Sequence, residues 1–223
     1  MRTGTFIRWS GFALLVWAAH LLLREFIFAF THGTTEAAMG DRILGLGSSQ
    51  YSVVWTPFPL LGVVGLIGLY AVVSTSIGRV GKAGLMVAIV GLALSFVGGV
   101  MQFWILDVDT YFYSPLVLGG WLLWLLSLLI ATTGLIIAGL GIARADALPG
   151  ARYVVLVIGL LALPTFFLQP WVVFNSDDSL SWRLLYGSLS VPYDLCWAWL
   201  GFVLIRAGRD RVPALPSTAQ QAG

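Results

Sequence analysis

Three ionisable side chains, His20, Arg24 and Glu25, interrupt an apolar run that extends from Phe6 to Phe30. A run of this length is typical of a membrane helix. A charged group at the centre of such a helix costs about 2.5–3.5 kcal/mol on insertion scales, so it usually faces protein or a water-filled cavity. We therefore expect the other helices to pack around residues 6–30. The sequence predicts a class, a topology and a site, but no substrate or reaction.

Arg24 needs a negatively charged partner because a guanidinium keeps its proton. Glu25 points about 100° away from Arg24 on a helical wheel, so it is expected to serve only in a bent geometry. Asp194 matches Arg24 in depth, at about 12 Å against about 9 Å below the same surface. The prediction is a structural ion pair between Arg24 and Asp194, with His20 beside it. The alternatives are a ligand- or proton-handling site, and an arginine that reaches the outer headgroups.

The remaining polar candidates lie in the same half of the apolar segments. Gln102 and Gln169 fall near the outer ends of two runs, and His20 lies about 15 Å below the surface, whereas the inner half is apolar and rich in glycine. This distribution predicts a polar pocket that opens outward. Its candidate ligand-binding residues are His20, Arg24, Glu25, Gln102, Gln169, Asp194 and Trp197.

Metal and haem chemistry find little support in the sequence. His32, the second histidine, lies about 18 Å from His20 along a helix, so the two cannot hold one haem or zinc ion, and a satisfied buried histidine is the plainer interpretation. Acidic residues in the predicted outer loops could ligate calcium. They lack the EF-hand spacing, so a solvated acidic surface is the alternative interpretation. No cofactor is expected, and the weak metal candidates are Asp107, Asp109, Asp177 and Asp178.

Eight of the ten tryptophans fall into two groups by depth. Four are placed near the outer interface, where tryptophan belts anchor membrane helices. Four deeper ones could stack on a flat apolar ligand such as a quinone or an isoprenoid, and simple packing is the alternative. The interfacial group is Trp55, Trp104, Trp171 and Trp182, and the deeper group is Trp121, Trp124, Trp197 and Trp199.

Composition places the chain among integral membrane proteins. Of its 223 residues, 59% are hydrophobic and 10% are charged, with a mean hydropathy of +0.92. A soluble domain carries about 25% charged residues. The net charge of +2 argues against nucleic acid as a partner. The lone Cys196 excludes an intrachain disulfide, and the long first run favours a retained helix over a cleaved signal peptide.

The predicted fold is an all-α bundle of six transmembrane helices over residues 1–212, followed by a disordered cytoplasmic tail, residues 213–223. Residues 34–46 form either a short interfacial helix or an irregular connector. The predicted spans are about 6–30, 54–75, 83–106, 115–142, 153–174 and 186–206.

The basic residues predict the orientation. If the N-terminus is inside, nine of the twelve lie at inner ends or loops, Arg42 and Arg183 lie outside, and Arg24 lies within the membrane. The positive-inside rule therefore places both termini in the cytoplasm. We expect a multi-pass protein of the plasma membrane, with the lipid bilayer as its environment and a membrane protein or a second copy as its partner.

The sequence predicts that two helical hairpins repeat. Each has a helix that ends in a similar motif before an acidic stretch, Gln102-Phe103-Trp104 in one and Gln169-Pro170-Trp171 in the other. Shared membrane-helix composition is the alternative explanation. The spacing of glycine and leucine in Gly65–Tyr70, with Gly78, Gly81, Gly84 and Gly91, and in Gly139–Gly150 resembles small uncharacterised bacterial multi-pass membrane proteins. The resemblance covers about half the chain and implies a plasma-membrane location, but no activity and no site residue.

Three functional hypotheses follow. The first is a non-enzymatic binding or accessory subunit with an outward-facing pocket. The second is a small transporter or a binder of a lipid-like ligand. The third is a membrane-embedded enzyme that uses Asp194 or Glu25 as acid or base, which requires that carboxylate to face a ligand-sized cavity.

Overall fold

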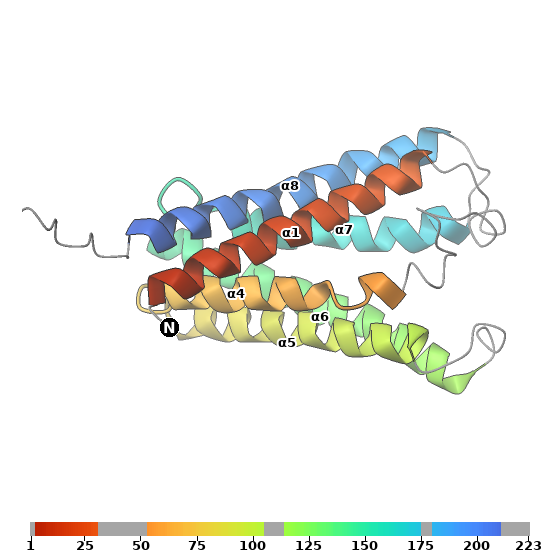
Figure 1. Ribbon diagram of the computed structural model, residues 1–223, viewed down its shortest axis with the longest axis horizontal. Coiled ribbons are helices and arrows are strands. Elements are labelled where there is room, and N and C mark those ends of the chain that lie inside the picture. Colours follow the sequence, from red (N-terminus) through yellow and green to blue (C-terminus); the bar gives the residue numbers. More distant parts are fainter. Residues whose placement is uncertain (1–2, 31–52, 105–113, 175–179, 211–223) are drawn as a thin grey trace, which may run out of the picture.

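The computed structural model describes residues 3–30, 53–104, 114–174 and 180–210. These residues are 88% helical, and no strand occurs among them. The predicted all-α class is therefore confirmed. The predicted loop helix at 34–46 and the predicted C-terminal tail fall outside the described residues. The helices, labelled as in Figure 1, are α1 (Thr3–Phe30), α4 (Pro59–Val73), α5 (Arg79–Phe103), α6 (Pro115–Ala145), α7 (Val154–Phe174) and α8 (Leu180–Asp210).

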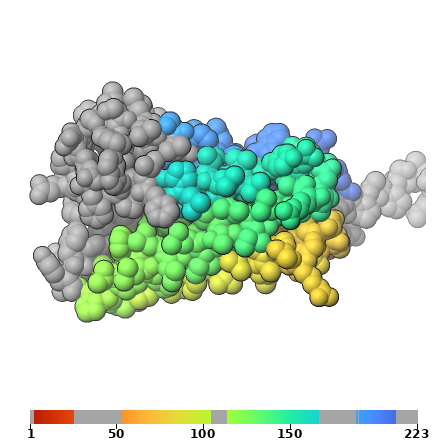
Figure 2. Space-filling model, turned by 180° about the vertical axis from the view of Figure 1, so that it is seen from behind, coloured from red at the N-terminus to blue at the C-terminus, as the bar shows by residue number. Residues whose placement is uncertain are grey.

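The helices run antiparallel in a closed ring. Each packs against its neighbours in sequence, and α8 packs against α1. α1 begins and α8 ends at the same end of the bundle, which we call the terminal end, while Phe30 and Leu180 mark the far end (Figure 1). From behind, α6 crosses the surface between α7 and α5 (Figure 2). A ring of this kind brings α1 and α8 together. The expectation that the other helices pack around residues 6–30 is wrong, because a helix in a ring packs mainly against two neighbours, which for α1 are α4 and α8.

Four helical segments among the described residues are long and apolar enough to cross a membrane. The described apolar part of α7, Val154–Phe166, is shorter. This supports a membrane location without fixing the number of spans or the sidedness. The four segments are Thr3–Glu25, Val53–Val73, Arg79–Phe103 and Pro115–Ala145.

A seam of small residues joins α5 to α6. Both helices present one at every seventh position, a period that keeps the same face of a helix against its neighbour. A Cβ added to Gly84 would lie 2.7 Å from the backbone nitrogen of Ala138. Without side chains in the way, the two backbones approach closely. The small residues are Gly84, Gly91 and Gly98 on α5 and Gly120, Ser127, Gly134 and Gly141 on α6.

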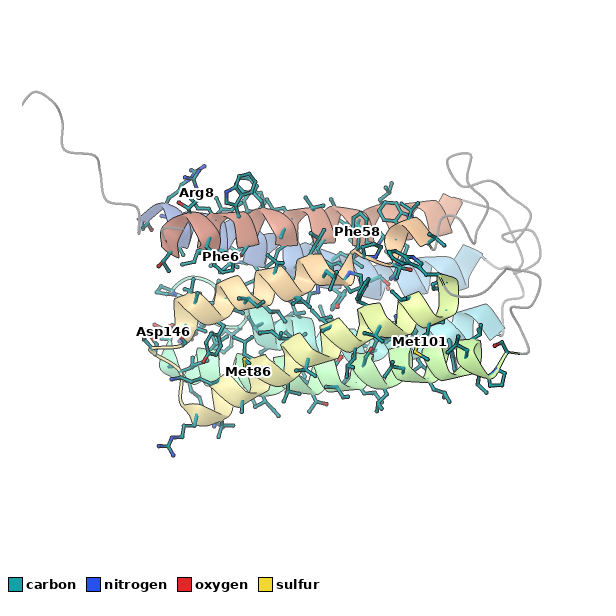
Figure 3. All side chains as sticks on the ribbon, turned by 60° about the horizontal axis from the view of Figure 1, so that its bottom comes forward. Phe6, Arg8, Phe58, Met86, Met101 and Asp146 are labelled. Atoms are coloured by element: carbon teal, nitrogen blue, oxygen red, sulfur yellow. The ribbon has the colours of Figure 1, made fainter. Side chains whose placement is uncertain are left out.

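Two prolines interrupt the helix that leads into α4. Pro57 and Pro59 have no amide hydrogen, so the regular ladder of hydrogen bonds is broken there. Tighter bonds replace it: the Phe58 amide donates to the Trp55 carbonyl at 3.1 Å, and the Leu60 amide donates to the Pro57 carbonyl at 3.0 Å. The resulting turn separates Trp55 from the body of α4 and places Phe58 between α1 and α4 (Figure 3).

Candidate functional site

A cavity of about 440 Å³ lies in the far half of the ring. Its walls come from the later part of α1, the turn before α4, the end of α5, the first half of α6, and single residues of α7 and α8. Because neighbouring helices run in opposite directions, all of these positions lie at one depth. Residues that represent each helix are Trp17 and His20, Trp55, Ser95 and Gln102, Trp124 and Thr132, Phe166, and Tyr193.

His20 lies in a stack of aromatic rings on one side of the cavity. Its imidazole is nearly parallel to the Trp55 indole, with 4.1 Å between ring centroids and 16° between planes. Phe58 packs against the same imidazole at 4.4 Å, and Trp17 lies 6.2 Å away. Figure 3 shows Phe58 in this crowded region between α1 and α4. His20 is therefore packed among aromatic rings and also lines the cavity. The expected satisfied histidine is not found, since its Nδ1 has no hydrogen-bond partner among the described residues.

The aromatic wall continues from α1 into α8 and α7. Trp17 meets Trp197 edge to face, with 6.5 Å between centroids and 88° between planes. Tyr193 lies 6.3 Å from Trp197 and 5.8 Å from Phe166. Edge-to-face geometry aligns the positive edge of one ring with the negative face of the next, which adds about 0.5–1.5 kcal/mol per pair to burial. The wall is therefore rigid.

α5 and α6 form the opposite wall, which mixes aromatic and polar side chains. Trp121 and Trp124 line it. Gln102 lines it too, and its Nε2 donates to the Gly98 carbonyl at 3.2 Å. The hydroxyl-bearing residues Ser95 and Thr132 are buried at mid-depth. Small polar groups thus alternate with flat apolar surface.

Arg24 forms its ion pair with Glu25. Its Nη2 donates to the Glu25 Oε1 at 2.8 Å, and its Nε donates to the same oxygen at 3.2 Å. The side chain of Glu25 is 5% exposed and that of Arg24 is 29% exposed. The expectation that Glu25 lies too far around the helix is therefore wrong, because the 100° offset applies to Cβ directions and the long arginine side chain spans the gap.

Asp194 is buried at 1% exposure and forms no ion pair with Arg24 among the described residues. The predicted clamp between first and last helix is thus replaced by a pair within α1, and the α1–α8 contact relies on packing. Gly11 shows how close this packing is, since a Cβ there would lie 2.6 Å from the Gly201 carbonyl oxygen.

Several buried polar atoms around the cavity have no hydrogen-bond partner among the described residues. Such groups are uncommon in protein interiors because desolvating them costs about 1–3 kcal/mol each. Two belong to residues that line the cavity, Trp17 and His20. The atoms are Trp17 Nε1, His20 Nδ1, Thr165 Oγ1, Asp194 Oδ2 and Trp197 Nε1.

The structure brings together only part of the predicted set. His20, Arg24 and Gln102 line the cavity, whereas Glu25, Asp194 and Trp197 are buried in the ring without lining it. Trp199, predicted as a deep stacking residue, is 54% exposed on the outside of α8. The side chain of Gln169, and with it the predicted hairpin repeat, lies outside the described residues, as do Asp107, Asp109, Asp177 and Asp178.

Among the described residues, no three histidine, cysteine or acidic side chains gather in a metal-binding arrangement. The lining described here also pairs no nucleophile with a base, since its histidine is stacked between aromatic rings. The arrangement therefore suits binding: a largely apolar space with a few fixed polar groups is the usual form of a small-molecule site.

The sequence analysis missed Trp17, Thr132 and Ser95 as cavity residues. Trp17 had a usable signal, because it precedes His20 by three residues and so shares its face of the helix. Thr132 and Ser95 were visible as hydroxyls within long apolar runs, but hydroxyls commonly bond their own helix backbone and are weak markers.

Comparison with family models, characterised proteins and solved structures finds no match to the chain. The resemblance to small bacterial multi-pass proteins accordingly stays an expectation from glycine and leucine spacing. The function must be argued from the cavity itself.

Proposed function

We propose that this chain is a non-enzymatic, multi-pass protein of the plasma membrane that binds one small, largely apolar molecule in the far half of its helix ring. The observation that carries the proposal is the cavity of about 440 Å³ lined from all six described helices. Ligand sites are typically about 300–1,000 Å³ and combine apolar walls with a few polar groups.

The proposed topology has six spans, with both termini in the cytoplasm. The basic residues support this orientation. Among the described side chains outside the cavity region, the positive charges lie at the terminal end, where the positive-inside rule places the cytoplasm. The cavity then faces the outer leaflet. These charges belong to Arg8, Arg79, Lys82, Arg144, Arg152, Arg206 and Arg209.

Binding is favoured over transport because the terminal half of the ring is packed by backbone contacts. A Cβ at Gly208 would lie 2.7 Å from the Gly4 carbonyl oxygen, and one at Gly139 would overlap the backbone of Leu156. A path through this half would require these contacts to separate. Binding is favoured over catalysis because Glu25 and Asp194, the proposed acid or base, do not line the cavity.

Adjacent threonines on α6 offer a matched test. Thr132 is buried and lines the cavity, while Thr133 is exposed on the outer face of the helix. A Thr132→Phe variant should fill the cavity with its ring, and Thr133→Phe should leave it open. Native mass spectrometry of the gently purified proteins would compare co-purified molecules and added 2-methylnaphthalene, a small apolar probe.

The expected result is a bound molecule on the wild type and on Thr133→Phe, and at least tenfold weaker retention on Thr132→Phe. Ser95→Leu fills the same space from α5 and serves if Thr132→Phe is not monodisperse. Equal retention by the cavity and surface variants, or no binding of probe or native molecule to the wild type, contradicts the proposal.

A further inference from the structure

A hollow of about 500 Å³ lies at the terminal end of the bundle, between the α6–α7 turn and α8. The turn, residues 146–153, supplies most of its lining, and Trp199 lines it from α8. Asp146, the first residue of the turn, lies at this end of the molecule (Figure 3). No residue lines both this hollow and the cavity in the far half, so the two are separate.

The lining of this hollow carries one charge of each sign. Asp146 provides a carboxylate and Arg152 a guanidinium, and both residues are exposed. The two do not pair with each other, since the ion pair of the described residues is the one between Arg24 and Glu25. Arg152 is instead held over the Tyr153 ring, with 4.6 Å between its Cζ and the ring centroid. The hollow therefore presents two opposite charges that no opposite charge of the described chain engages.

The apolar residues around this hollow suit a lipid surface. Tyr153 is 51% exposed and Trp199 is 54% exposed, and such rings gather at the headgroup level of a bilayer. Leu195 is also exposed, one turn before Trp199 on the same face of α8. Because α8 ends at the terminal end, Leu195 lies further from that end than Trp199. In the proposed topology, the charges of the hollow lie among the headgroups of the cytoplasmic leaflet, with Trp199 and Leu195 beside the acyl chains.

A zwitterionic headgroup matches these two charges better than a headgroup with one charge. A phosphodiester offers oxygens to the Arg152 guanidinium, which can donate two parallel hydrogen bonds. A primary ammonium group offers three N–H donors to the Asp146 carboxylate. A headgroup that carries only a phosphate would place a second negative charge beside Asp146, and a quaternary ammonium has no N–H to donate. Phosphoethanolamine carries both of the required groups.

We propose that this hollow binds the headgroup of a phosphatidylethanolamine molecule from the cytoplasmic leaflet. Its phosphate contacts Arg152, its ammonium contacts Asp146, and its acyl chains lie along Trp199. Pockets of this kind between membrane helices are known to recognise lipid headgroups by charge. The proposal goes beyond the ligand site in the far half and requires only that the terminal end lie at a lipid surface.

Three lipids with the same acyl chains test the proposal. Native mass spectrometry of the detergent-purified chain, titrated with dioleoyl phosphatidylethanolamine, phosphatidylcholine or phosphatidylglycerol, gives a dissociation constant for each. The wild type should bind phosphatidylethanolamine about two- to tenfold more tightly than the other two, the gain expected for one hydrogen bond. This comparison needs no variant, so it tests the proposal even if a variant does not fold.

Two substitutions assign the contacts. Asp146→Asn should remove the preference for phosphatidylethanolamine over phosphatidylcholine. Asparagine suits this position because Asp146 has a φ of 47°, in the left-handed region that asparagine also adopts. Arg152→Gln should weaken the binding of all three lipids, because each of them carries a phosphate.

The matched controls are Asp210→Asn and Arg144→Gln. Both residues are exposed near the terminal end and neither lines the hollow. These variants should leave the three dissociation constants unchanged. Thr132→Phe, which fills the cavity in the far half, should also leave them unchanged, so failure of the headgroup site is distinguishable from failure of the proposed function.

Several outcomes would overturn the proposal. Equal wild-type binding of phosphatidylethanolamine and phosphatidylcholine, or a preference that survives Asp146→Asn, contradicts the ammonium contact. Tightest binding of phosphatidylglycerol would indicate a site for anions instead. Equal effects of Arg152→Gln and Arg144→Gln would show that the hollow does not select a headgroup at all.

Discussion

The two halves of the ring differ in how their helices pack. In the terminal half, small residues bring helix backbones together: a Cβ at Gly84 would meet the Ala138 nitrogen at 2.7 Å, and a Cβ at Gly68 would overlap the Ser10 side chain. In the far half, the α5–α6 seam continues at Gly98 and Gly120. Large rings such as Trp17, Trp55 and Trp124 surround a cavity there as well. Small residues close a helix interface, whereas rigid aromatic side chains keep space open.

Buried polar atoms without a partner among the described residues are more numerous around the cavity than in the terminal half, where Arg8 Nε is one. Ser10, in the terminal half, donates from its Oγ to the Phe6 carbonyl at 2.9 Å. Trp17, Thr165 and Asp194, around the cavity, keep buried polar atoms without a partner among the described residues. If the cavity binds a ligand as proposed, stability depends mainly on one end of the bundle and binding on the other, so substitutions at the two ends should have different effects.

The largest effect is expected from Gly84→Val at the α5–α6 seam. The new side chain would collide with the backbone of α6, which cannot move aside as a flexible side chain can. We expect a loss of about 3 kcal/mol or more in unfolding free energy. The matched control is Gly119→Val, because the nearest atom to a Cβ at Gly119 is the Met101 Cε at 3.7 Å. Denaturation in detergent measures the unfolding free energy of both variants. Equal values would contradict the claim that close backbone packing at the α5–α6 seam stabilises the bundle.

An intermediate effect is expected from Glu25→Gln. It leaves the Arg24 charge without its carboxylate and should cost about 2–3 kcal/mol, below the value for a fully buried pair because Arg24 is partly exposed. Asp194→Asn breaks no ion pair among the described residues and should cost less. Thermal unfolding monitored by tryptophan fluorescence ranks the two. A larger loss of thermal stability in Asp194→Asn than in Glu25→Gln would support the predicted ion pair between Arg24 on α1 and Asp194 on α8.

The smallest effect is expected from Thr165→Val, which removes a buried hydroxyl without changing the volume of the side chain. Because this hydroxyl has no partner among the described residues, the variant should be neutral or up to about 1 kcal/mol more stable. Ser10→Ala, its counterpart, removes a satisfied hydrogen bond and should be about 1 kcal/mol less stable. A Thr165→Val variant that is the less stable of the two would show that its hydroxyl has a partner.

The helical segments could be predicted from the sequence because long apolar runs have few alternatives. The segment predicted at 115–142 is α6, Pro115–Ala145, whose start is marked by the Ser114 oxygen that accepts from the Leu116 amide at 3.3 Å. The segment predicted at 186–206 is longer at both ends, as α8, Leu180–Asp210. Its polar end residues carry no hydrophobic signal, so the apolar pattern could not show the extension.

The site was less predictable. Sequence spacing shows which residues share a helix face, and so it placed His20 and Gln102 correctly in one half. It does not show how far a side chain reaches, which is why Glu25 was expected to pair with Arg24 only in a bent geometry. It also does not show how far apart two helices stand, so the cavity and the role of Thr132 in it required the three-dimensional arrangement.

The pairing of Arg24 with Glu25 has a consequence for synthesis. α8 is made after α1, α4, α5, α6 and α7, so a counter-charge on α8 would reach Arg24 only after those helices had left the ribosome. An adjacent glutamate travels with the arginine instead. If α1 spans the membrane as proposed, it would enter the bilayer with its arginine already paired, and the cost of inserting an isolated charge would not depend on a distant helix.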